Sequence, residues 1–383
     1  MSVREKLIAT GPKKILTIDG GGIRGVLALE ILVAIEDLLR EQSQRDDLTL
    51  ADTFDYISGT STGAIIAAGL ALGMPARTLL DFYVEEGAAM FARASLLRRF
   101  HYRFEDDNLV VRLKELVGAD TRLGSDRLQT LLMMVMRNAT TDSPWPVSNN
   151  PYAKYNDIDS EECNLNLPLW QLVRASTAAP MYFPPETIQV GRQSFIFVDG
   201  GISPYNNPSF LTFLMATTDR FWINRARLGG LAVTWPAATG TERLLLVSIG
   251  TGSAANANEG LLPDEINLVY NISAIPAALM FAAGSQQDML CRVFGDCLAG
   301  IPLDREIDDL IGTEGPVNPK LFTYVRYSAE LSREGLRALG CAHIEPSDVQ
   351  RLEGVDAIPQ MREVGRAVAK RKVRAAHFSR FPV

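Results

Sequence analysis

The chain has 383 residues and a mass of 42.0 kDa, a length that fits one large α/β domain with additions, or two domains. Hydrophobic residues make up 47% and charged residues 22%, which excludes disordered, collagen-like and coiled-coil proteins. Lys and Arg total 38 and Asp and Glu total 45, for a net charge of −7. An acidic chain argues against a general nucleic-acid coat, so no DNA or RNA partner is expected.

The cysteines and the apolar windows predict a cytoplasmic protein. Four cysteines are too few for a disulfide scaffold, and Cys291 and Cys297 lack the spacing of a zinc site, so we expect reduced thiols and no metal. The first residues contain no apolar stretch of signal-peptide length. The longest apolar windows, Ala64–Met74 and Ile272–Ala283, fall short of the roughly 20 residues of a membrane span. Any lipid substrate must then be met at a membrane surface.

Two strand–turn–helix units open the chain. The first unit has a buried strand, Lys14–Ile18, then a glycine loop at Gly20–Gly25 and a helix that extends to Arg40. The second has a strand at Phe54–Ser58, a turn at Gly59–Gly63 and a helix of small residues. Alternating strands and helices favour a mostly parallel sheet with right-handed crossovers.

Further along the chain, apolar patterns predict additional elements. Residues 138–167, which are rich in Asn, Asp, Ser and Pro, predict a long loop. Residues 361–383 carry seven Lys or Arg against one Glu, so the last helix is basic. The predicted helices are Ala76–Phe91, Glu105–Val117, Leu169–Ala178 and Ile358 to about Phe378, and the predicted strands are Leu131–Met136, Phe195–Val198, Leu244–Ile249 and Phe322–Tyr327.

The turn at Gly59–Gly63 reads G-T-S-T-G, the pattern of a nucleophile elbow. Such a turn holds its serine in unusual backbone angles, and the flanking glycines let neighbouring backbones approach. The helix that follows presents its positive N-terminal end to a developing negative charge. Ser61 is therefore the candidate nucleophile, although a plain turn shows the same letters.

A serine nucleophile needs a base. The three histidines, His101, His343 and His377, do not follow predicted strands, where α/β enzymes place catalytic groups. Asp199 ends a buried strand and precedes two glycines, so its carboxylate can reach the edge of the sheet where Ser61 emerges. These residues favour Asp199 as the base, with an ordinary turn aspartate as the alternative.

The glycine loop at Gly20–Gly25 fits the G-x-G-x-x-G fingerprint of dinucleotide-binding enzymes. That fingerprint requires an acidic residue at the end of a second strand about twenty residues on, and none is found there. An oxyanion hole is the better interpretation. The amides of Gly21 and Gly22 would then face the substrate oxygen, and Arg24 would add positive charge.

Together these motifs resemble those of the patatin-like phospholipases, in the order that this family has them. The similarity covers roughly residues 13–212 and rests on four segments: Asp19–Gly25 (D-G-G-G-I-R-G), Gly59–Gly63, Ala175–Pro185 (A-S-T-A-A-P-M-Y-F-P-P) and Asp199–Gly201 (D-G-G). The resemblance implies a three-layer α/β/α fold with a mostly parallel central sheet. It also implies hydrolysis of lipid acyl esters by a Ser61/Asp199 dyad, with no cofactor. Residues 213–383 would complete the sheet, add a helical elaboration and carry regulatory elements.

Two further segments are similar to bacterial patatin-like effectors of CBASS antiphage systems, the CapV type. They are residues 140–146 (T-T-D-S-P-W-P) and 321–327 (L-F-T-Y-V-R-Y). This resemblance implies that a cyclic dinucleotide activates the enzyme, which then degrades membrane phospholipid. It identifies no nucleotide-binding residue.

Three alternatives stay open: an unregulated acyl hydrolase, a non-catalytic nucleotide-sensing module on a lipase fold, and a dinucleotide-dependent oxidoreductase. The oligomeric state also stays open, with a homo-oligomer among the options.

Overall fold

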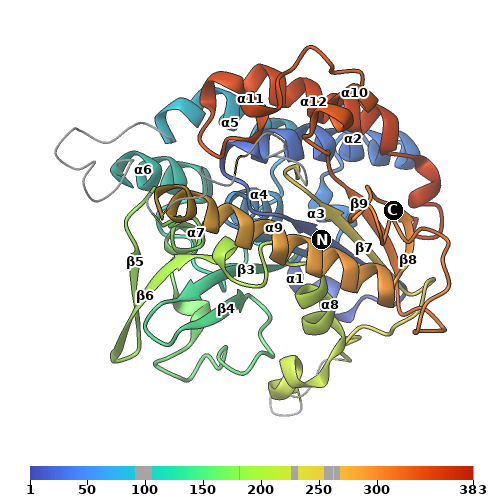
Figure 1. Ribbon diagram of the computed structural model, residues 1–383. Helices are drawn as coiled ribbons and strands as arrows, with labels where there is room; N and C mark the ends of the chain where they lie inside the picture. The colour runs from blue at the N-terminus through green and yellow to red at the C-terminus, as the bar shows by residue number, and fades with distance from the viewer. Residues whose placement is uncertain (91–105, 181, 226–231, 254–261, 263–267, 383) are drawn as a thin grey trace.

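The computed structural model describes residues 1–90, 106–180, 182–225, 232–253, 262 and 268–382. A central sheet lies between two layers of helices (Figure 1). The strand order is β5-β6-β3-β2-β1-β7-β9-β8, and β4 also pairs with β3. This arrangement is the α/β/α architecture expected from the sequence, with its mostly parallel sheet.

Six strands form the parallel part of the sheet. In chain order they are β1 (Lys13–Ile18), β2 (Tyr56–Thr60), β3 (Leu131–Asn138), β7 (Leu244–Ile249), β8 (Asp296–Ala299) and β9 (Thr323–Tyr327). Side chains from β2, β7 and β9 are all buried, as expected of strands covered on both faces. Strands β7, β8 and β9 come from the C-terminal region, so both predicted regions of the chain contribute to one sheet.

Helices cover both faces of the sheet. One core cluster joins one face to helices of the upper layer in Figure 1, and a second joins the other face to α8. Alternate residues of β1 divide between the two clusters: Leu16 and Ile18 enter the first, and Ile15 enters the second. The longer helices are α2 (Gly25–Ser43), α4 (Thr62–Ala71), α5 (Ala76–Met90), α6 (Asp106–Val117), α7 (Leu169–Ser176), α8 (Ser209–Thr217), α9 (Leu268–Phe294) and α12 (Ile358–Lys372).

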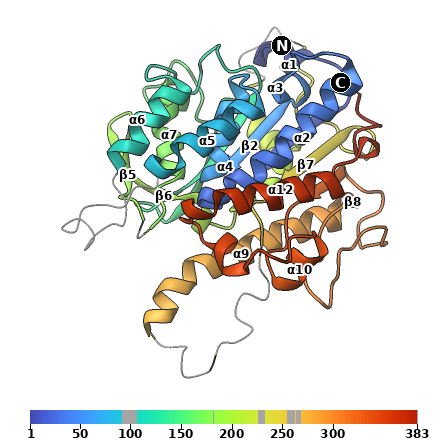
Figure 2. The ribbon, with the colours of Figure 1, turned by 90° about the horizontal axis from the view of Figure 1, so that it is seen from above.

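The remaining helical elements are short. They are α1 (Val3–Ile8), α3 (Leu50–Thr53), α10 (Arg333–Ala338), α11 (Pro346–Gln350) and the 3-10 turns η1 (Gly22–Arg24), η3 (Asn164–Asn166), η4 (Gly200–Ile202), η5 (Asp219–Arg225), η7 (Val355–Ala357) and η8 (Ala375–His377). Seen from above, α12 lies beside α2, so the C-terminal region packs against a helix from the N-terminal part of the chain (Figure 2).

Three sequence predictions were wrong. The predicted loop at 138–167 contains strand β4 (Ser143–Ser148), which pairs with β3; its Pro144 and Pro146 are tolerated because β4 has no second neighbour in the sheet. Strand β5 (Glu186–Val190) was not predicted, and it pairs antiparallel with β6 (Gln193–Asp199).

The third error concerns the basic helix, predicted to reach about Phe378. Helix α12 ends at Lys372, and a separate turn, η8, follows it. The predicted helix ends at Phe91 and Glu105, and the residue His101, lie outside the described residues.

Candidate active site

Ser61 stands alone between β2 and α4 with the backbone angles φ 56° and ψ −125°. This conformation is strained for a residue with a side chain. The turn closes so tightly that a Cβ on Gly59 would lie 1.9 Å from the carbonyl oxygen of Gly63, and a Cβ on Gly63 would lie 2.2 Å from that of Ile18. Only glycine fits at both positions, which explains the G-x-S-x-G pattern physically.

Ser61 and Asp199 are in direct contact. The Ser61 Oγ donates a hydrogen bond of 2.6 Å to Asp199 Oδ2, and both residues are buried. Asp199 ends β6, which pairs antiparallel with the carboxyl end of β3. Ser61 directly follows β2, which pairs parallel with β3. The sheet therefore brings together two residues that are 138 positions apart in sequence.

The second oxygen of Asp199, Oδ1, accepts a hydrogen bond of 2.6 Å from the Gly201 amide, which fixes the carboxyl group. Burial raises the pKa of Asp199 to about 6, against the hydrogen bonds from Ser61 and Gly201. A carboxylate of this pKa is a stronger base than an exposed aspartate and is still ionised near neutral pH.

Ser176, on α7, links the turn that carries Ser61 to β3. Its Oγ accepts a hydrogen bond of 2.9 Å from the Ser61 amide and donates one of 2.6 Å to the carbonyl oxygen of Val135 on β3. Ser176 lies in the family-like segment Ala175–Pro185, but no pattern in the sequence predicted a role for it. The signal was the small-residue run before Pro180, but the contact depends on how α7 packs.

The glycine loop lies against Ser61 through Gly20. The Gly20 amide donates to the carbonyl oxygen of Asn206, and a Cβ on Gly20 would lie 3.2 Å from the Ser61 Cβ. Within the described part of the chain, no hydrogen bond is recorded from the amides of Gly21 and Gly22. Gly22 has a positive φ of 59° and packs against the carbonyl oxygen of Leu352, where a Cβ would clash.

Arg24 is part of the same glycine loop, Gly20–Gly25. Its Nε donates a 3.4 Å hydrogen bond to the carbonyl oxygen of Gly21. Burial lowers the pKa of Arg24 to about 10, while Asp19 acts in the opposite direction. At neutral pH the guanidinium is still charged, so it can contribute positive potential to the loop.

Asp19, directly before the loop, forms a two-point ion pair with Arg326 of β9, with Nη1–Oδ1 at 2.9 Å and Nη2–Oδ2 at 2.5 Å. Arg326 also donates to Ser248 on β7. Burial by itself would lower the pKa of Arg326, but the Asp19 carboxylate raises it above its ordinary value. Sequence reasoning missed this pair, although an arginine inside an otherwise apolar strand was a signal of a buried partner.

The described histidines lie elsewhere. His343 is exposed and faces Glu363 at 3.2 Å, and the Nδ1 of His377 is 2.6 Å from the Tyr327 hydroxyl oxygen. Neither contacts Ser61 or Asp199. Across the residues that the structure describes, no group of three His, Cys, Asp or Glu side chains is arranged to hold a metal ion.

Comparisons with known proteins identify the family of the chain. A family model described as patatin-like phospholipase matches residues 16–211, which is more than half of the chain. The chain therefore belongs to the patatin-like phospholipase family.

Among curated proteins, Patatin-15 of Solanum tuberosum is 27% identical over 266 residues, covering 66% of this chain and 63% of the relative. Patatin-like protein 4 of Arabidopsis thaliana is 30% identical over 255 residues, covering 63% and 59%. The chain thus spans less than two thirds of the length of these relatives. A search of solved structures returned VipD from Legionella pneumophila, with 16% identity, a TM-score of 0.34, and coverage of 92% of this chain and 67% of that one.

In the part of the chain that the structure describes, no helix combines the length and the apolar character needed to cross a membrane.

Proposed function

We propose that the protein is a lipid acyl hydrolase that cleaves ester bonds of membrane phospholipids through the Ser61/Asp199 dyad. The observation that carries this proposal is the 2.6 Å hydrogen bond between the Ser61 hydroxyl and the Asp199 carboxylate on a strained turn at the edge of the sheet. Membership of the patatin-like phospholipase family supports the substrate class.

In the proposed reaction, Asp199 accepts the hydroxyl proton as the Ser61 Oγ attacks the ester carbonyl carbon. The tetrahedral intermediate then collapses, and the protonated Asp199 returns the proton to the departing alcohol oxygen. The product is an acyl-serine ester. Water activated by the same carboxylate then attacks this ester and releases the fatty acid.

The glycine loop is the proposed oxyanion site. The Gly21 and Gly22 amides have no acceptor among the described residues, and Arg24 adds positive charge beside them. Hydrogen-bond donors that are already oriented toward the position of the oxyanion stabilise the transition state more than the ground state, because the negative charge develops only in the transition state. Asp19, held by Arg326, keeps the first residue of this loop in position.

The test is Ser61→Ala. Hydrolysis of phospholipid vesicles and of a soluble short-chain ester should fall by at least about 10⁴-fold, because the nucleophile is lost. The protein should still fold, since a methyl group replaces a small hydroxymethyl group. The control is His343→Gln, which should keep turnover. Continued hydrolysis by pure Ser61→Ala protein would contradict the assignment.

The proposed regulation is activation by a cyclic dinucleotide, as in an antiphage effector located in the cytoplasm and peripheral to the inner membrane when active. Its support is the similarity of residues 140–146 and 321–327 to CapV-type effectors. The first segment contains the turn between β3 and β4 and the start of β4, and the second contains the buried strand β9, so both contribute to the sheet.

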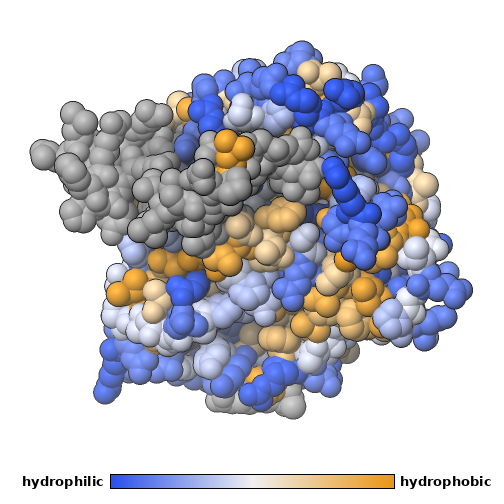
Figure 3. Space-filling view, viewed as in Figure 1, coloured by the Kyte–Doolittle hydropathy of each residue, from blue (hydrophilic) through white to orange (hydrophobic). Residues whose placement is uncertain are grey.

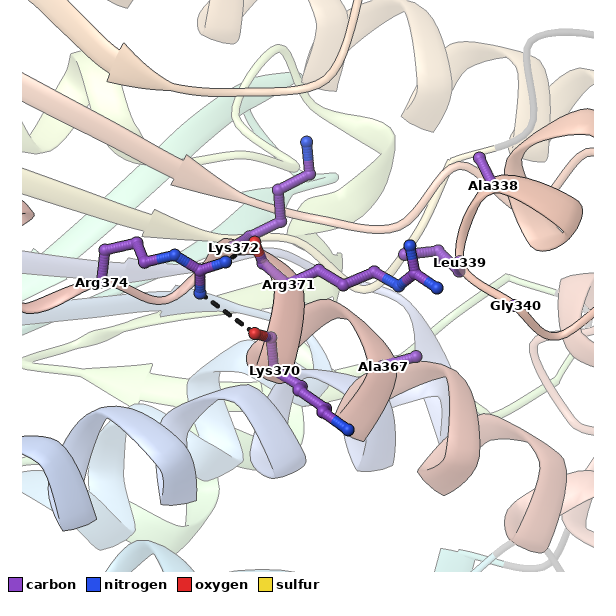
Figure 4. Close-up of a pocket in the computed structure, with 8 residues that line it drawn as sticks. All are labelled: Ala338, Leu339, Gly340, Ala367, Lys370, Arg371, Lys372 and Arg374. Atoms are coloured by element: carbon purple, nitrogen blue, oxygen red, sulfur yellow. Dashed lines mark hydrogen bonds between the residues drawn. The ribbon is translucent and has the colours of Figure 1, made fainter.

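The nucleotide site is not assigned. A cavity of about 660 Å³ at the end of α12 is lined by Lys370, Arg371, Lys372 and Arg374. These side chains point away from one another, and Arg374, which follows α12, donates to the carbonyl oxygens of Lys370 and Arg371 at the end of that helix (Figure 4). Diverging cations do not form a phosphate cradle.

The regulation is tested by adding a panel of cyclic dinucleotides to purified protein with phospholipid vesicles. The expected result is low turnover alone and a large rise with one member of the panel, with a shift in oligomeric state measured in parallel. High turnover that no nucleotide changes would favour the unregulated hydrolase.

A further inference from the structure

The two parts of helix α9 differ in how deeply their side chains are buried. Its C-terminal half is anchored in the protein. Asp288 and Arg292 are buried and form a two-point ion pair, and the Tyr324 hydroxyl donates to Asp288 at 2.9 Å. Cys291 is completely buried. The hydrogen bond from Tyr324 therefore fixes this half of α9 to strand β9.

The segment Ala278–Ala283 of the same helix is mostly exposed and apolar. Leu279 is 53% exposed and Phe281 is 39% exposed. No charged residue occurs between Leu268 and Gln287. An exposed helix of a globular protein normally carries a charged or polar face toward water, so this surface is unusual. In Figures 1 and 3, apolar surface gathers along the course of α9.

This segment also borders the catalytic dyad. A Cβ on Gly201, two residues after Asp199, would lie 3.3 Å from the Met280 Cε. One turn further along, the carbonyl oxygen of Gly284 accepts a hydrogen bond of 3.5 Å from Asn207. Met280 therefore lies beside Gly201, two residues after the proposed base, while Leu279 and Phe281 on the same turn are exposed.

We propose that the Ala278–Ala283 segment of α9 is a docking surface for a lipid bilayer or micelle at the mouth of the active site. The proposal rests on the proposed function, because a bilayer substrate must deliver its ester to the buried Ser61. An uncharged apolar surface enters the acyl region of a lipid layer without the cost of removing water from charges. The helix is held at its far end by Asp288 and Arg292, so this contact would place the lipid beside Met280.

The test uses Ser61→Ala protein, so that vesicles are not consumed, and vesicles of pure phosphatidylcholine, so that net charge plays no part. Leu279→Gln/Phe281→Gln should weaken vesicle binding at least about tenfold, because two half-exposed apolar side chains no longer leave water. The matched control is Ile223→Gln on η5, which is 46% exposed and should change binding less than twofold. In otherwise wild-type protein, the ratio of vesicle turnover to soluble-ester turnover should fall by a similar factor.

The outcomes separate this proposal from the proposed function. Weaker vesicle binding supports docking even if no ester is hydrolysed. Unchanged vesicle binding overturns docking even if Ser61 is the nucleophile. A loss of self-association with unchanged vesicle binding would assign the surface to a second copy of the chain and also overturn the proposal. The milder pair Leu279→Met/Phe281→Leu should retain binding; if it loses binding as severely as the Gln pair, apolar docking is overturned.

Discussion

Asp19 and Asp199 are both buried carboxyl groups at the carboxyl edge of the same sheet, but their partners differ. Asp19 faces the guanidinium of Arg326 in a two-point ion pair. Asp199 accepts hydrogen bonds from a hydroxyl and an amide, those of Ser61 and Gly201. The first arrangement pairs the carboxylate with a positive charge, whereas the second leaves the carboxylate, our proposed base, in contact with the Ser61 hydroxyl, our proposed nucleophile.

Two carboxyl groups in similarly buried surroundings thus take different partners, an arginine for Asp19 and a serine hydroxyl for Asp199. Burial raises the pKa of both carboxyl groups. At Asp19, the charge of Arg326 opposes this rise and connects the glycine loop to β9. At Asp199 the rise brings the pKa to about 6, near the pH at which a general base works best. Substitutions at these two sites should therefore separate activity from stability.

The largest effect is expected for Asp199→Asn. Turnover should fall by about 10³-fold or more, because an amide cannot accept the serine proton. Turnover by the unaltered protein should rise with pH through about 6 as Asp199 ionises. Both are measured as kcat/KM on a soluble ester. A variant with near-normal turnover would show that another group is the base.

The same substitution should increase stability at high pH. The folded pKa of Asp199 lies above its ordinary value, so the folded protein binds the extra proton and loses stability as pH rises from about 4 to about 6. Asp199→Asn removes this loss, and at pH 8 its free energy of unfolding should exceed that of the unaltered protein by up to about 3 kcal/mol. Denaturant unfolding at pH 4 and pH 8 provides the comparison; equal differences at both values would contradict it.

Arg326→Met should affect stability first. Removing one partner leaves the Asp19 charge buried, at a cost of about 3–5 kcal/mol in the free energy of unfolding. The double variant Asp19→Asn/Arg326→Met should recover part of this cost. The control is Arg333→Ala, which breaks an exposed pair with Glu345 and should cost less than about 1 kcal/mol. A small effect of Arg326→Met on the free energy of unfolding would contradict the structural role of the Asp19–Arg326 ion pair.

Ser176→Ala should give an intermediate effect on both properties. The Ser61 amide and the Val135 carbonyl lose their partner, which costs about 1–3 kcal/mol in stability. Turnover should fall about tenfold, because the nucleophile turn loses its support. Ser58→Ala breaks another buried hydroxyl contact on β2, with Thr212, and serves as control. Equal turnover of the two variants would show that Ser176 does not position Ser61.

The smallest effect is expected at the end of α12. Reversing Lys370, Arg371 and Lys372 to Glu should reduce binding to anionic vesicles about threefold at low salt and less at physiological salt. The effect is modest because these side chains diverge, so a flat surface meets only some of them. Binding is measured by co-sedimentation. If the variant instead loses activation by a cyclic dinucleotide, these basic side chains would belong to the nucleotide-binding site. If vesicle binding and activation are both unchanged, the basic side chains would only be solvated at the end of the helix.

Local patterns in the sequence predicted much of the fold and the dyad. Apolar runs gave the positions of β1, β3, β7 and β9, because burial on both faces requires continuous apolar sequence. Among the missed strands, β4 and β5 have alternating or Pro-containing sequences at the antiparallel end of the sheet, where the apolar signal is weak. Strand β8 was also missed, because its four residues include the charged Asp296 and give only a short apolar signal. The glycines around Ser61 identified the turn because any side chain there would meet backbone.

By itself, the sequence determined the residue types that chemistry and tight turns require: the serine, the aspartate and the glycines between strands and helices. Only the tertiary structure decided which distant groups meet them. Ser176 reaches the Ser61 amide through the packing of α7, Arg326 reaches Asp19 across neighbouring strands, and Met280 of α9 comes to lie beside Gly201. Contacts of this kind depend on sheet order and helix packing. These arise from burial summed over the whole chain, and no short segment records them.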